Sequence, residues 1–149
     1  MNAPRRFFFY GTLLAGMDIA LTRRVHGHLL ALGPAQVRGR LVAIPDPDGW
    51  YPALLSGEGR VAGMLYAARP SFSRATLDEL DAYEGGCSRA HGAGEYRRVA
   101  IGVRLDDGRC RAAQAYLYAR PLPRGSRELP GGDFVSWLVG TGASPFRQA

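Results

Sequence analysis

The sequence contains no lysine: all 19 of its basic residues are arginine, against 13 acidic residues, and the formal net charge is +6. Arginine, alanine and glycine have GC-rich codons, so this bias is typical of a GC-rich genome. The arginines are scattered along the chain, whereas a nucleic-acid surface usually has clustered basic charge or a recognisable binding motif. We therefore expect no nucleic-acid partner, although the charge can raise the local concentration of small anions.

Long hydrophobic runs and cysteines are also scarce. No apolar run approaches the roughly 20 residues that a membrane-spanning helix needs, and the apolar segment 7–10 ends at Gly11 without the apolar core of a signal peptide. Cys87 and Cys110 lack CxxC spacing and metal-ligand neighbours, so we expect reduced thiols, with one disulfide as the alternative. The composition predicts a cytoplasmic protein without membrane association.

The length of 149 residues and the apolar fraction of 46% are ordinary for one globular domain. We expect a single domain over residues 1–149, with its core at about 7–120. The tail, 121–149, is rich in proline and glycine, but Phe134, Trp137 and Leu138 form a short amphipathic piece that can pack on the body.

Strand patterns dominate the chain. The segment Asp106-Asp107-Gly108 predicts a hairpin, Gly33-Pro34 predicts a turn, and Gly63 predicts a bulge or a close contact within a strand. Hairpin connections favour an antiparallel sheet or a small barrel. The expected strands are 7–10, 36–44, 60–67, 96–105 and 110–119, with an aromatic segment at 50–55.

One helix is clearly indicated, over residues 75–84, with Ser71 or Ser73 as its cap and Gly85-Gly86 as its stop. The segment before the first long strand, 14–32, is ambiguous. It contains His26 and His28, which strand spacing would place on one face, as a metal pair requires. No third ligand lies nearby, so we favour a solvated or capping pair and expect no metal site.

Glu84 shares a helix face with apolar residues. Leu77, Leu80 and Glu84 stand at i, i+3 and i+7, so the carboxylate lies on the stripe expected to point inward. Burial and the negative end of the helix dipole would both raise its pKa, from ~4.3 toward ~6–7, where a glutamate works as a general acid and base. The alternatives are an ion pair with Arg97 or Arg98, or exposure to solvent. The other acidic residues of this helix can turn toward water: Asp78, Glu79 and Asp81.

The first strand ends in a glycine turn. Phe7-Phe8-Phe9-Tyr10 is typical of a buried strand, and Gly11 permits the close approaches that aim backbone N–H groups at a carboxylate or an oxyanion. The alternative is a core strand followed by an ordinary turn.

These two features together resemble the gamma-glutamylcyclotransferase superfamily, in particular its AIG2-like, gamma-glutamylamine cyclotransferase branch. Tyr10-Gly11-Thr12-Leu13 is similar to the family's Y-G-[ST]-L substrate loop, and Leu80–Gly85 is similar to its L-D-x-[FY]-E segment with a catalytic glutamate. The resemblance implies an α+β fold, a small mixed, mostly antiparallel β-barrel with flanking helices. The loop 86–94 and the tail after Pro121 match no family pattern. Weaker matches are Tyr51-Pro52-Ala53-Leu54, the segment 61–66, Tyr96-Arg97-Arg98-Val99 and Tyr116-Leu117-Tyr118.

The resemblance implies an enzyme that converts a gamma-glutamyl amine or peptide to 5-oxoproline and a free amine, without a metal or organic cofactor. Arg98 would bind the substrate carboxylate or tune Glu84, while Tyr10 and Tyr116 would either contact the substrate or pack in the core. Another acyl-transfer or amide-cleaving reaction at the same site, and a non-catalytic binding module, are the alternatives. The implied residues are catalytic Glu84 and substrate-binding Tyr10, Gly11, Thr12, Leu13, Arg98 and Tyr116.

Overall fold

The computed structural model describes residues 5–11, 20–47, 49–86 and 96–144. Judged by length and hydropathy, none of the helices within these ranges could span a bilayer. The elements follow one another in the order β1 (Arg6–Phe9), α1 (Ala20–His26), β2 (Leu29–Asp46), β3 (Gly49–Ala68), α2 (Arg74–Gly86), β4 (Tyr96–Leu105), β5 (Cys110–Tyr118), β6 (Arg127–Glu128) and α3 (Phe134–Thr141).

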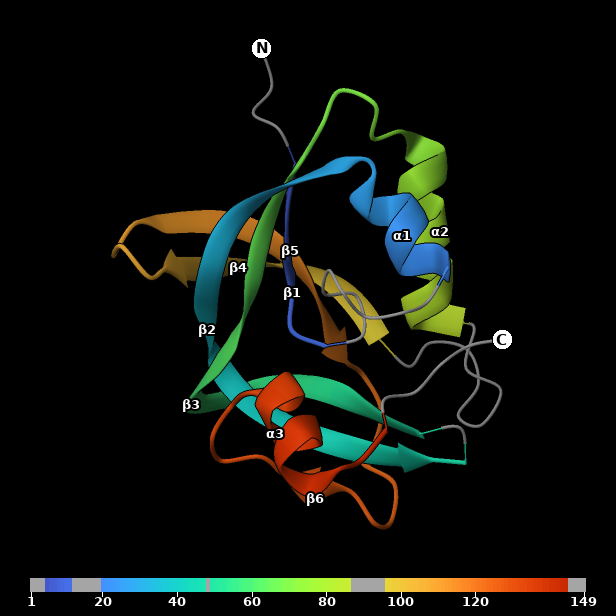
Figure 1. Cartoon of the computed structure of the whole chain (residues 1–149), viewed down its shortest axis with the longest axis vertical. Coiled ribbons are helices and arrows are strands. Elements are labelled where there is room, and N and C mark those ends of the chain that lie inside the picture. The colour runs from blue at the N-terminus through green and yellow to red at the C-terminus, as the bar shows by residue number, and fades with distance from the viewer. Residues whose placement is uncertain (1–4, 12–19, 48, 87–95, 145–149) are drawn as a thin grey trace.

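The strands form a closed barrel (Figure 1). They are joined in the order β3-β1-β5-β4-β2, and the pairing of β2 with β3 closes the sheet, while β6 adds to β2. The pairing of β1 with β5 is parallel, and the others are antiparallel. The α+β fold expected from the sequence, a mixed and mostly antiparallel barrel with flanking helices, is confirmed.

Two of the expected turns have different outcomes. The hairpin at Asp106-Asp107-Gly108 is confirmed, because the N–H of Gly108 donates to the carbonyl of Leu105 at 2.9 Å and Gly108 has a φ of +90°. The turn expected at Gly33-Pro34 is wrong: β2 continues through it, with a register shift between Ala31 and Gly33. The glycine, at φ +138°, bends the strand as a bulge without reversing the chain.

The opening aromatic strand is buried on both faces. Phe7 and Phe9 pack in a cluster with Leu77 and Leu80 of α2, while Phe8 faces the barrel interior. All three rings are at most 2% exposed. Alternation along a strand explains the division, because successive side chains point to opposite faces. The first strand is therefore held from both sides, which fixes the place where it ends.

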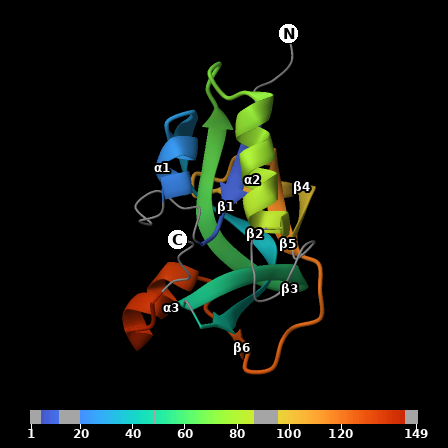
Figure 2. The ribbon, with the colours of Figure 1, turned by 90° about the vertical axis from the view of Figure 1, so that its right-hand side faces the viewer.

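Helices α1 and α2 lie side by side on one flank of the barrel (Figures 1 and 2), joined by an ion pair of 3.2 Å between Arg24 and Glu79. The predicted cap of α2 is confirmed at Ser73, whose Oγ accepts a hydrogen bond of 3.2 Å from the N–H of Thr76. The helix ends at Gly86. At the other end of the barrel, α3 buries Phe134 and Leu138 in the barrel interior, in the same hydrophobic cluster as Phe8.

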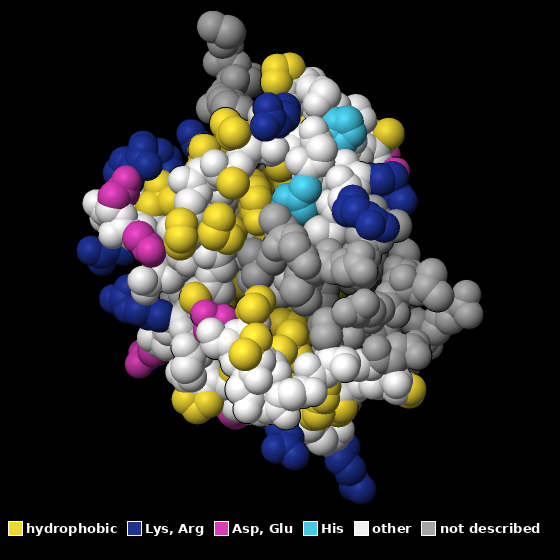
Figure 3. Space-filling model, viewed as in Figure 1, with side chains coloured by type: hydrophobic (Ala, Val, Ile, Leu, Met, Phe, Trp, Pro, Cys, Tyr) yellow, Lys and Arg dark blue, Asp and Glu magenta, His cyan; other side chains and the backbone are white. Residues whose placement is uncertain are grey.

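The arginine side chains visible on the face in Figure 3 are spread around its edges, several of them beside acidic side chains. His26 and His28 do not share a strand. His26 belongs to α1 and packs against the Tyr66 ring at 4.7 Å between centroids, whereas the Nδ1 of His28 lies 2.9 Å from the Oγ of Ser71. Within the described ranges, no three His, Cys, Asp or Glu side chains gather as metal ligands would.

The close contact predicted at Gly63 gives a first test of the packing. A Cβ at this position would collide with the carbonyl oxygen of Phe9 and lie 2.7 Å from the Cζ of Phe8. We expect Gly63→Ala to lower the free energy of unfolding by about 1–3 kcal/mol, as overpacking does. Equilibrium urea denaturation would measure it. Gly102→Ala is the matched control, because a Cβ there meets nothing within 4 Å, and equal stabilities of the two variants would contradict this packing.

Candidate functional site

The hydroxyl of Tyr10 ties the end of β1 to two other strands. It donates a hydrogen bond of 2.5 Å to the carbonyl oxygen of Tyr116 on β5 and accepts one of 3.3 Å from the N–H of Leu54 on β3. The Tyr10 side chain is 7% exposed and belongs to the barrel interior. These bonds are those of a core ring with its hydroxyl satisfied, one of the two roles that the sequence left open; substrate contact stays a prediction.

Gly11 follows at a point of close approach. The residue is buried, and a Cβ there would overlap the ring of Pro52 on β3. The carbonyl oxygen of Pro52 in turn accepts a hydrogen bond of 2.5 Å from the hydroxyl of Tyr96. Glycine is therefore required here by space, as the close approach predicted from the sequence implies. Thr12 and Leu13 lie outside the described residues.

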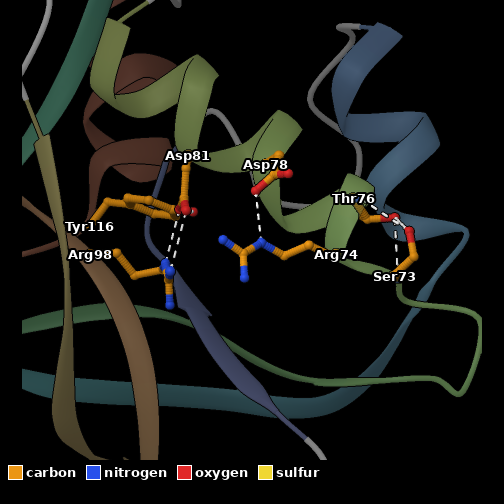
Figure 4. Close-up of polar contacts among 7 residues, drawn as sticks. All are labelled: Ser73, Arg74, Thr76, Asp78, Asp81, Arg98 and Tyr116. Carbon is orange, nitrogen blue, oxygen red and sulfur yellow. Dashed lines mark hydrogen bonds and ion pairs between the residues drawn. The ribbon is translucent and has the colours of Figure 1, made fainter.

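Asp81 connects α2 to the barrel (Figure 4). Its Oδ1 accepts hydrogen bonds from the Tyr116 hydroxyl at 2.7 Å and from the Nε of Arg98 at 2.9 Å, and its Oδ2 accepts one from the Nη2 of Arg98 at 3.2 Å. Arg98 and Tyr116 are direct partners on β4 and β5, so their side chains stand on the same face of the sheet. The cluster of Asp81, Arg98 and Tyr116 is called the Asp81 cluster below.

The guanidinium of Arg98 has a further partner, the Oε1 of Gln114, to which its Nη1 donates. The side chains of Arg98 and Asp81 are 30% and 39% exposed, so the pair is partly buried. The hydrogen bonds and the negative charge of Asp81 raise the pKa of Arg98 above its ordinary value, and the guanidinium stays charged. A two-pronged contact of this kind fixes geometry as well as charge.

Tyr116 links the two segments that the sequence predicts to be functional. Its carbonyl oxygen binds the hydroxyl of Tyr10, next to the turn at Gly11, and its own hydroxyl binds Asp81 on α2. The side chain is 3% exposed and packs with Phe7, so it is part of the core. One residue of β5 therefore sets the end of β1 and the last turns of α2 relative to each other.

Asp81, which the sequence allows to turn toward water, is 39% exposed, but both of its carboxylate oxygens accept hydrogen bonds from Arg98 on the barrel. Helical spacing had separated it from the inward stripe of Leu77 and Leu80, which is confirmed as buried. Helical spacing could not predict the contacts with Arg98 and Tyr116, whose long side chains extend from the sheet to Asp81. The two neighbouring acidic residues lie in exposed ion pairs, Asp78 with Arg74 and Glu79 with Arg24.

A family model for "Gamma-glutamyl cyclotransferase, AIG2-like" matches residues 7–136. The chain belongs to this family. The match includes the turn after β1, helix α2 and the Asp81 cluster. No curated protein sequence matches the chain.

Solved structures share the fold of this AIG2-like chain. An AIG2-like protein from Mus musculus has a TM-score of 0.59 at 22% identity, covering 82% of each chain. A Pyrococcus horikoshii protein has a TM-score of 0.62 at 18% identity, covering 93% of this chain and 96% of the other. YkqA from Bacillus subtilis has 0.65 at 17% identity, covering 94% of this chain but only 43% of its own. At these identities the likeness establishes the fold alone.

The structure brings four of the predicted site residues into one connected set. Tyr10 and Tyr116 are hydrogen-bonded, Gly11 follows Tyr10, and Arg98 meets Tyr116 at Asp81. The backbone at position 84 belongs to α2, three residues after Asp81, whereas the Glu84 side chain lies outside the described residues.

A separate cavity of about 480 Å³ lies between β2, β3 and the start of α3. Arg60, Met64, Asp106 and Asp133 are among the residues that line it. None of the predicted site residues that the structure describes is among them, so this cavity is distinct from the connected set around Tyr116.

The buried hydroxyl of Tyr10 can be tested directly. Tyr10→Phe leaves the Tyr116 carbonyl and the Leu54 N–H without this partner, so we expect the free energy of unfolding to fall by about 1–3 kcal/mol. Urea denaturation would measure the loss. Full stability in the variant, together with weaker substrate binding, would instead assign the hydroxyl to the substrate.

Proposed function

We propose that this protein converts a gamma-glutamyl amine or a gamma-glutamyl peptide to 5-oxoproline and a free amine. The observation that carries the proposal is the family match over residues 7–136, which spans both the Tyr10–Leu13 turn and the helix with Glu84. The contacts through Tyr116, which join the turn to that helix, support a single site formed by the two.

The reaction is an internal acyl transfer. The α-amine of the gamma-glutamyl group attacks its own γ-carbonyl carbon, a new C–N bond closes the five-membered ring, and the original amide C–N bond breaks. The attacking amine loses one proton and the leaving nitrogen gains one, so no oxidant, metal or organic cofactor enters the balance. Because the nucleophile is tethered, a site that holds the folded conformer gains much of its rate from orientation, equivalent to effective molarities of roughly 10⁵–10⁸ M.

Glu84 is the proposed acid and base that moves this proton. Position 84 follows the fully buried Leu80 by four residues on a helix that continues to Gly86, which supports placing it on the inward stripe. At the C-terminal end of the helix, the dipole would raise the pKa of a carboxyl group. One carboxylate between the two nitrogens can accept the first proton and return it to the leaving group.

The turn after β1 is the proposed oxyanion and substrate loop. The close approach of Gly11 to Pro52 supports a backbone held in a fixed place, as preorganised N–H donors require. Each well-placed N–H group from residues 11–13 would stabilise the developing oxyanion by roughly 3 kcal/mol. Phe7 and Phe9, buried against the helices, would hold this loop in position.

The test is 5-oxoproline release from a panel of gamma-glutamyl amines and dipeptides. We expect at least one substrate to be turned over, and Glu84→Gln to lower kcat by about 10²–10⁴-fold, the usual contribution of a general acid and base. Glu79→Gln is the matched control on the same helix, because Glu79 lies in an exposed ion pair and should leave kcat unchanged.

Three other results would contradict the proposed mechanism or indicate a different function. Activity that survives Glu84→Gln contradicts the mechanism. Amine release without 5-oxoproline indicates another amide-cleaving reaction, and saturable ligand binding without turnover indicates a binding module.

A further inference from the structure

Helix α2 has three ion pairs among the described residues, and they differ in environment. The Arg74–Asp78 pair, 3.1 Å apart, has side chains that are 81% and 62% exposed, and the Arg24–Glu79 pair is 61% and 49% exposed. The pair of Arg98 with Asp81, the third carboxylate, is 30% and 39% exposed. Asp81 also accepts a third hydrogen bond, from Tyr116. Because charge-assisted and bidentate hydrogen bonds are the strong ones, Asp81 is the firmest polar anchor among the side chains of the helix that the structure describes.

Asp81 lies shortly before the end of the helix at Gly86. Leu80 is fully buried, and the helix continues only to Gly85-Gly86, two residues with poor helix propensity. Helix ends fray, so the final turn depends on contacts made just before it. Leu80, by its burial, and Asp81, by its hydrogen bonds, provide such contacts within the part of α2 that the structure describes. Position 84 follows within one turn.

The same carboxylate is connected to the turn after β1. Tyr116 donates its hydroxyl to Asp81 and accepts the Tyr10 hydroxyl at its carbonyl, and Tyr10 precedes Gly11. The route from the helix to the proposed oxyanion loop thus passes through two hydrogen bonds. A displacement of about 1 Å between catalytic groups can cost about 10²-fold in rate, so this alignment has a direct kinetic consequence.

We propose that Asp81 is a positioning residue, whose contacts with Arg98 and Tyr116 hold the last turn of α2 in register with the turn at Gly11. The inference rests on the proposed function, in which those two segments provide the acid and base and the oxyanion donors. In this arrangement Arg98 acts on the reaction through Asp81, because its guanidinium is committed to Asp81 and Gln114.

The first test compares two carboxylates of one helix. Asp81→Asn keeps the shape of the side chain and removes its charge, and we expect kcat to fall by about 10- to 100-fold with KM changed by less than about threefold. Asp78→Asn is the matched control, since its ion pair is exposed, and kcat should stay unchanged. An unchanged kcat in Asp81→Asn, or an effect confined to KM, would overturn the inference.

Tyr116→Phe covers the possibility that Asp81→Asn fails to fold, because it removes a single oxygen atom. We expect a smaller loss of kcat, about three- to tenfold. The double variant with Asp81→Asn should lose no more than Asp81→Asn alone, since residues that act through one contact are not additive. Independent, multiplied losses would contradict a shared role.

A second readout needs no substrate. We expect amide hydrogen exchange over residues 82–86 to be faster in Asp81→Asn than in the wild type, and unchanged in Asp78→Asn. An inactive wild-type protein would overturn the proposed function, and with it the effect of Asp81 on the reaction. An active wild type whose Asp81→Asn variant shows unchanged exchange would overturn the positioning role alone.

Discussion

The arrangement of the candidate site depends on Tyr116. Its backbone carbonyl accepts a hydrogen bond from Tyr10, and its side-chain hydroxyl donates one to Asp81. Its strand, β5, is paired with β1 on one side and with β4 on the other. Pairing with β1 brings its carbonyl to the Tyr10 hydroxyl, and pairing with β4 places its ring opposite Arg98. A shift in the register of β5 would break both relations at once, because side chains alternate between faces along a strand.

Local signals in the sequence identify most of the barrel, because strand alternation and hairpin turns depend on neighbouring residues. Local signals fail where the same short sequence fits two different backbone structures. A Gly-Pro pair is typical of a turn, but in β2 the long pairing with β3 on both sides of Gly33 keeps the chain extended, and the irregularity is absorbed as a bulge. Only the partner strand decides between the two outcomes, and the partner is distant in sequence.

The same limit applies to the site. Gly11 stands out in the sequence because an abrupt glycine after an aromatic run is a local pattern, and the inward stripe of α2 follows from helical spacing. Asp81 does not stand out, because its partners lie 17 and 35 residues further along the chain, on β4 and β5. A helical wheel places an aspartate beside the apolar stripe and assigns it to solvent. It contains no information on an arginine and a tyrosine that project from a neighbouring sheet.

A partly buried ion pair is a weak means of stabilising a fold, since removing charges from water offsets much of their attraction. The Asp81 cluster sits beside Leu80 and Phe7, where apolar side chains would pack without that desolvation cost. An apolar contact is not directional: it fixes the distance between two side chains but not the angle between them. The Asp81 carboxylate receives donors from two strands, and this defines how α2 lies across the sheet. We therefore interpret the cluster as a device for alignment, placed between the two segments whose relative position the proposed reaction requires.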